Sequence, residues 1–74
     1  MIKELDLVVL TQDIPEHRLC EGDIGAVVLV HGEGAGYEVE FVMLDGSSLG
    51  AVTVDKTAIR RVSGREIAHV REVA

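Results

Sequence analysis

The chain has 74 residues, nearly half of them hydrophobic, and its formal net charge at pH 7 is −6. This length allows one domain with a small core, and that core must be aliphatic, because the chain has one Phe, one Tyr and no Trp. A single cysteine excludes an internal disulfide and a four-cysteine zinc site, and no apolar run approaches the roughly 18 residues of a membrane span.

The first predicted strand covers residues 5–10, where leucine and valine occur on both faces. A polar connection over residues 11–21 follows, and a loop this long in a small domain is often functional. Ile14 and Leu19 are its two large apolar residues. We expect them to pack the loop onto the body of the domain.

A hairpin is predicted in the centre of the chain. Residues 24–31 form a nearly continuous apolar run, which is typical of a strand covered on both faces. Residues 37–43 alternate between apolar and acidic side chains with the period of two that marks a half-buried strand. The glycine-rich segment between them supplies the positive φ angles that a tight turn needs.

The register of this hairpin depends on its turn. If the loop spans residues 32–36, His31 lies opposite Tyr37, and Val28 and Val30 share the other face with Glu38. A bulge in the glycine loop would swap that pairing. In either register the outer face of the first strand is too apolar to lie fully in water, so another segment should cover it.

The second half of the chain predicts two more strands. An Asp-Gly turn at residues 45–46 leads into a strand over residues 49–54. Residues 55–58 predict one helical turn with Asp55 as its N-cap, and residues 59–62 predict a short fifth strand. Five short strands, a long loop after the first and a helical turn before the last predict an all-β fold, the SH3-like barrel, over residues 1–62.

The C-terminal tail, residues 63–74, is compatible with a short helix or an edge strand. Ile67, Val70 and Val73 recur every three residues and are the only large apolar side chains left unassigned. Their burial would offset the entropy of ordering the segment. We therefore expect the tail to be packed over the outer valines of the barrel or on a second subunit, and its removal after Val62 to lower the melting temperature sharply.

Gly25 lies where the chain turns into the first strand of the hairpin. We expect a positive φ there, and a β-branched side chain cannot adopt that conformation cheaply. The sequence therefore predicts that Gly25→Val damages folding.

Charge is distributed unevenly along the chain. Residues 1–55 carry a net charge of −9, and residues 56–74 carry +3. This pattern suits a basic protein partner or self-association through the tail, and it matches nucleic acid poorly, because nucleic-acid binding depends on neutralising phosphates. We expect Arg65 and Arg71 to lie near the acidic side chains of Glu38 and Glu40.

The sequence contains no recognisable catalytic, cofactor-binding or metal-binding pattern. Its three histidines are scattered without ligand spacing, and Ser47 and Ser48 lie in a turn with no triad partners apparent. Glu38 and Glu40 are two residues apart on an exposed strand, where carboxylates are usually solvated. We therefore expect a non-enzymatic protein with no cofactor and no metal.

Residues 21–27, Glu-Gly-Asp-Ile-Gly-Ala-Val, resemble the KOW motif of ribosomal and transcription-factor barrels, in which a Gly-Asp-x-Gly-x-Val run turns into a strand. The chain as a whole resembles a family of short bacterial proteins, common in cyanobacteria, that is known as a domain of unknown function. The likeness rests on residues 5–10, 13–15, 22–25, 37–41 and 65–71. It implies a small five-stranded KOW-type barrel with a short C-terminal strand or helix. The family's members look like small partner proteins, of the antitoxin or immunity-protein kind, encoded beside a larger one.

These observations favour a cytoplasmic protein-interaction module, either monomeric or oligomeric, with an unidentified protein partner and no membrane contact. The alternative is a KOW-like nucleic-acid-binding protein that uses the basic C-terminal segment. The candidate partner-binding residues are Glu33, Glu38, Glu40, Arg60, Arg61, Arg65 and Arg71.

Overall fold

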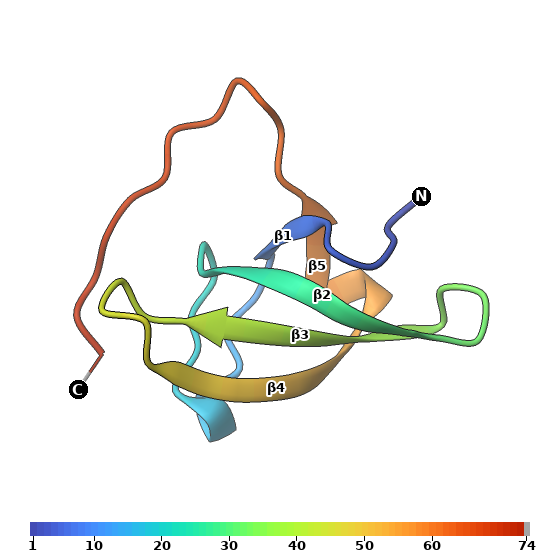
Figure 1. The fold of residues 1–74 in the computed structure, drawn as a ribbon, viewed down its shortest axis with the longest axis horizontal. Helices are drawn as coiled ribbons and strands as arrows, with labels where there is room; N and C mark the ends of the chain where they lie inside the picture. Colours follow the sequence, from blue (N-terminus) through green and yellow to red (C-terminus); the bar gives the residue numbers. More distant parts are fainter. Residues whose placement is uncertain (74) are drawn as a thin grey trace.

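Five antiparallel strands form one sheet in the computed structural model, which describes residues 1–73 (Figure 1). The strands are β1 (Leu7–Leu10), β2 (Ile24–His31), β3 (Gly36–Val42), β4 (Ser48–Asp55) and β5 (Ile59–Arg61). The sheet order is β4-β3-β2-β1-β5. The sheet is open, with β4 and β5 as its two edges. The prediction of an all-β fold with five strands is confirmed.

Two short 3₁₀ turns complete the regular structure. The first, η1 (Pro15–His17), lies in the long loop after β1, and the second, η2 (Lys56–Ala58), joins β4 to β5. The Asp55 side chain accepts a hydrogen bond from the Thr57 N–H and so caps η2, as the sequence predicted. The structure describes no α-helix in residues 1–73.

The core is aliphatic with two aromatic rings, and it lies on one face of the curved sheet. Its fully buried side chains include those of Val8, Leu10, Val27 and Val39. The long loop reaches this core through Leu19, which is buried, and Ile14, which packs against it. The prediction that these two residues attach the loop to the body is confirmed.

A bulge at Val28 sets the register of the β2–β3 hairpin. Val27 lies opposite Val39, but Leu29 lies opposite Glu38 and Val30 opposite Tyr37, so Val28 is the extra residue. The predicted pairing of His31 with Tyr37 is therefore wrong, because the bulge lies within β2 and shifts every later side chain to the other face. Val30 packs against the core, and Leu29 faces outward with Glu38.

Gly25 lies in β2 with ordinary strand backbone, so the expected positive φ at this position is wrong. The left-handed conformation falls on Gly22 instead, with a φ of 96°. Gly25 is nevertheless constrained, because its α-carbon faces the core where Val39 and Phe41 already fill the space.

The tail after β5 forms neither of the predicted regular structures. Residues 62–73 contain one turn at Gly64–Arg65 and no strand or helix. Figure 1 shows the tail leaving β5, arching away from the sheet and returning beside the turn between β3 and β4. The expected burial of Ile67 and Val70 is wrong, since these side chains are 88% and 82% exposed. Val73, the third of these residues, is partly buried. Val28 and Val42, which the tail was expected to cover, are also exposed.

Candidate functional site

A groove lies between the returning tail and the end of the sheet where β2 begins and β3 ends. Its volume is about 490 Å³. The sheet side is formed by residues around Asp23, by the end of β3 and by the β3–β4 turn, and the tail contributes residues 68–73. The groove therefore combines segments that are far apart in sequence, from Leu19 to Val73.

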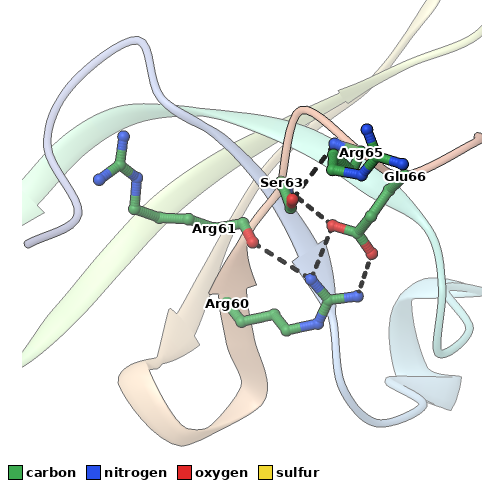
Figure 2. A network of polar contacts seen from close by, with 5 residues as sticks. All are labelled: Arg60, Arg61, Ser63, Arg65 and Glu66. Carbon is green, nitrogen blue, oxygen red and sulfur yellow. Dashed lines mark hydrogen bonds and ion pairs between the residues drawn. The ribbon is translucent and has the colours of Figure 1, made fainter.

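The beginning of the tail is fastened to β5 by Glu66. Nη1 of Arg60 donates to Oε1 of Glu66 at 2.9 Å, and Nη2 donates to Oε2 at 2.6 Å. The Ser63 N–H donates to Oε1 of the same carboxylate at 2.6 Å. Figure 2 shows these contacts converging on the Glu66 carboxylate, which folds the tail back on Arg60. The Arg60 and Ser63 hydrogen bonds lower the pKa of Glu66 to about 2, so it is ionised at neutral pH.

The far end of the tail is fastened to the β2 entry by Arg71. Its Nε donates to Oδ1 of Asp23 at 2.8 Å, and its Nη2 donates to Oδ2 at 2.6 Å. The same Nη2 donates to the carbonyl oxygen of Arg18 at 2.9 Å. Arg18 directly follows η1 and adopts the left-handed backbone conformation. Its carbonyl oxygen accepts the hydrogen bond from Arg71 of the tail.

Asp23 is built into the loop independently of the tail. Its Oδ2 accepts the Cys20 N–H at 2.8 Å, and its side chain is only 16% exposed. Burial raises the pKa of Asp23, but the hydrogen bonds from Arg71 and from the Cys20 N–H outweigh burial and leave that pKa below its ordinary value. In the folded chain the carboxylate is therefore ionised and paired with the guanidinium group of Arg71.

Acidification is expected to release the far end of the tail. The pKa of Asp23 is lower in the folded protein than in the unfolded chain. The ionised Asp23 therefore contributes its full stabilisation of the folded state above about pH 4, and this stabilisation is lost as the pH falls through the folded pKa. NMR can follow the Arg71 Nε–H resonance and the amide exchange of residues 67–73 during an acid titration. The Asp23→Asn variant should show the released tail already at neutral pH. Unchanged Arg71 and tail signals in that variant would contradict the assignment.

Exposed apolar side chains from four segments line this groove. They come from the start of β2, the end of β3 with its turn, β4 and the tail. Leu44 is 93% exposed and Val70 is 82% exposed. The exposed large apolar residues on the groove are Ile24, Val42, Leu44, Leu49 and Val70.

The predicted acidic residues lie away from this groove. Glu33 is in the β2–β3 turn, and Glu38 and Glu40 are on the outward face of β3. Glu38 accepts from the Thr53 hydroxyl and contacts Nε2 of His31 at 2.7 Å, and these His31 and Thr53 hydrogen bonds lower its pKa. Glu40 accepts from the Ser48 hydroxyl at 3.1 Å. The expected proximity of Arg71 to these acids is wrong, because Arg71 binds Asp23.

Figure 2 shows Arg60, Arg61 and Arg65 in one polar network at the beginning of the tail, whereas Arg71 lies apart from them, bound to Asp23. Arg60 binds Glu66, Arg61 approaches Asp6 at 3.6 Å, and Arg71 binds Asp23. The Arg65 side chain has no ion pair within residues 1–73, although its N–H donates to the Ser63 hydroxyl (Figure 2). Most of the positive charge of the C-terminal segment is therefore matched by carboxylates of the same chain.

Sequence reasoning identified Arg71 but missed its partner. Asp23 was recognised only as part of a Gly-Asp turn motif, and its pairing with Arg71 spans 48 residues. The groove residue Leu44, which lies directly before the predicted Asp-Gly turn, was not among the candidate site residues. The sequence did contain a signal for this residue. A large apolar side chain directly before an Asp-Gly turn is expected to be exposed to solvent, and an exposed leucine is a candidate contact residue.

In the part of the chain that the structure describes, no group of three or more His, Cys, Asp or Glu side chains could hold a metal ion. Residues 1–73 also contain no helix that is long and apolar enough to cross a membrane.

Comparison with known proteins gave one family. The family described as "Domain of unknown function (DUF4926)" matches residues 4–61. This range contains all five strands and Asp23, and it ends before the tail. No curated protein and no solved structure matches the chain.

Proposed function

The protein belongs to the DUF4926 family, whose function is unknown, and we propose that it is a non-enzymatic protein-interaction module that binds its partner through the groove under the tail. The observation that carries this proposal is the set of exposed apolar side chains around that groove. Contiguous apolar surface is uncommon on soluble proteins and marks interaction sites. The partner is the larger product of a neighbouring gene, in the manner of an antitoxin or immunity protein.

The two anchors of the tail support this proposal. Glu66 and Arg71 fix the tail at both ends, and Ile67 and Val70 between them remain exposed. These two side chains add exposed apolar surface beside the groove, and a partner can cover that surface. Two of the charged groups on the groove, Asp23 and Arg71, are bound to each other, which favours a binding role over catalysis.

The proposal includes a fold type and a location. The sheet order β4-β3-β2-β1-β5, with a single 3₁₀ turn between the two edge strands, supports an SH3-like, KOW-type barrel. The unpaired Cys20 supports a reducing compartment and hence the cytoplasm.

Substitutions in the groove test the proposed function. Leu44→Asp and Val70→Asp place charges on the apolar walls, whereas Leu5→Asp changes a side chain that is also exposed but does not line the groove. We expect tagged wild-type protein and Leu5→Asp to retain the same stoichiometric protein from the native host, and both groove variants to lose it at least about tenfold, since buried charge at an interface costs several kcal/mol. Equal retention by all four proteins, or no retained protein with the wild type, would overturn the proposal.

Nucleic-acid binding through Arg60, Arg61, Arg65 and Arg71 is the weaker alternative. Three of these arginines already bind or approach carboxylates, so few are available for phosphates. Affinity of the full chain for an RNA or DNA duplex tighter than about 100 μM at low salt, with a steep salt dependence, would favour this alternative.

A further inference from the structure

We infer that the groove recognises an arginine-bearing extended segment of the partner, and that the chain's own tail occupies this site until the partner displaces it. This inference rests on the interaction role proposed above and specifies its ligand. Arg71 then acts as an internal occupant, and its contacts reveal which chemistry the site accepts.

The site is suited to a guanidinium group. Both oxygens of Asp23 accept from Arg71, through Nε and Nη2, and the Arg18 carbonyl accepts a further bond from Nη2. Three hydrogen bonds donated by one side chain match the rigid fork of arginine, whereas the ammonium group of lysine cannot make a bidentate contact of this kind. The site should therefore discriminate arginine from lysine.

The receptor side of this contact does not depend on the tail. The Cys20 N–H holds Oδ2 of Asp23, and Asp13 accepts the Glu21 N–H at 2.8 Å and so braces the same loop. With Arg71 bound, the Asp23 side chain is 16% exposed. A carboxylate that the loop itself positions can offer an arginine from another chain the same hydrogen bonds that it offers Arg71.

The tail is a weakly held occupant. Its anchors are ion pairs whose arginine side chains are about half and one-third exposed, and such pairs contribute little net stability. Ile67 and Val70 bury almost nothing, so the apolar walls of the groove around Leu44 are left uncovered. A partner segment that supplies an arginine and also covers these walls would bind more favourably than the tail.

Charge complementarity favours a basic partner segment. Residues 1–55, which include the receptor side of the groove, have a net charge of −9. This field accelerates association with a cationic segment and disfavours an acidic one. Release of the tail would also free Arg71 and the apolar residues beside it to contact the same partner.

A labelled peptide with the sequence of residues 64–73 tests the inference on full-length proteins by fluorescence anisotropy. Arg71→Gln leaves the receptor side intact but weakens the internal occupant, so we expect it to bind the peptide about tenfold more tightly than the wild type does. A peptide with lysine at the position of Arg71 should bind the Arg71→Gln protein at least about fivefold more weakly. Adding Asp23→Asn to Arg71→Gln should abolish binding of both peptides. Arg65→Gln, which changes a tail arginine outside the groove, should behave like the wild type.

Equal affinity of the wild type and Arg71→Gln for the peptide would overturn the inference, as would equal binding of the arginine and lysine peptides. The lysine comparison keeps the test decisive if Asp23→Asn fails to fold. Loss of the native partner in Leu44→Asp, together with no peptide binding by Arg71→Gln, would overturn this inference and leave the proposed function standing. Peptide binding with the expected arginine preference, without any protein retained by the wild type, would overturn only the proposed function.

Discussion

Gly25→Val is expected to destabilise the protein by about 3 kcal/mol or to prevent folding, because there is no space for a side chain at this position. A β-carbon on Gly25 would lie 2.6 Å from Cγ1 of Val39, 2.8 Å from the Glu40 carbonyl oxygen and 3.0 Å from Cδ1 of Phe41. Val39 is fully buried and cannot move aside, and the carbonyl belongs to β3. The clash can be relieved only by separating β2 from β3.

Chemical denaturation of Gly25→Val, Gly25→Ala and Gly64→Val checks this result. A β-carbon on Gly64 would have no atom within 4 Å, and Gly64 has no left-handed φ, so Gly64→Val should change the free energy of unfolding by no more than about 0.5 kcal/mol. Gly25→Ala should fall between the two valine variants. A Gly25→Val protein that unfolds at the same denaturant concentration as the wild type would show that the core is loosely packed here.

Leu10→Ala is expected to cost about 2–5 kcal/mol of unfolding free energy, the range for deleting a buried leucine side chain in a tight core. Leu10 is 2% exposed and packs in the core at the end of β1, where that strand pairs with β5. A domain of this size has a net stability near the lower end of the usual range of about 5–15 kcal/mol. The variant should therefore be partly unfolded at physiological temperature.

Leu44→Ala is the matched control for Leu10→Ala. It removes the same atoms from a side chain that is 93% exposed, so the thermal midpoint should be nearly unchanged. Calorimetry or circular dichroism would measure both variants. Similar midpoints for Leu10→Ala and the wild type would contradict the assignment of Leu10 to the core.

The structure changes the expected consequence of removing the tail. The sequence predicted a sharp loss of stability after truncation at Val62, because three apolar side chains were expected to become buried. Ile67 and Val70 are exposed and only Val73 is partly buried, so removal of the tail exposes little additional apolar surface to water. The main loss is the pair of anchors at Glu66 and Arg71, which concerns the groove more than the sheet.

The strands and their turns could be predicted from local patterns. The alternation over residues 37–43 and the Asp-Gly turn at residues 45–46 indicate β3 and the hairpin into β4, because side-chain period and turn conformation depend on neighbouring residues only. The attachment of the long loop by Ile14 and Leu19 was also predictable, since these are its only large apolar side chains. The importance of Gly25 was predicted for the wrong reason, because crowding by β3 is not visible from β2 alone.

Local sequence patterns were sufficient to predict an all-β fold with five strands, an aliphatic core and a C-terminal segment of distinct charge. Two features are visible only in the tertiary structure. One is which side of the hairpin faces the core, and the other is the place where the tail contacts the sheet. A bulge at Val28 reverses the facing of Val30 and His31 without any glycine to mark it, because bulges reflect how two strands fit together. The Arg71–Asp23 contact joins residues 48 positions apart, and such a contact has no period or spacing in the sequence. It forms because the loop after η1 fixes a shielded carboxylate where the returning tail can reach it.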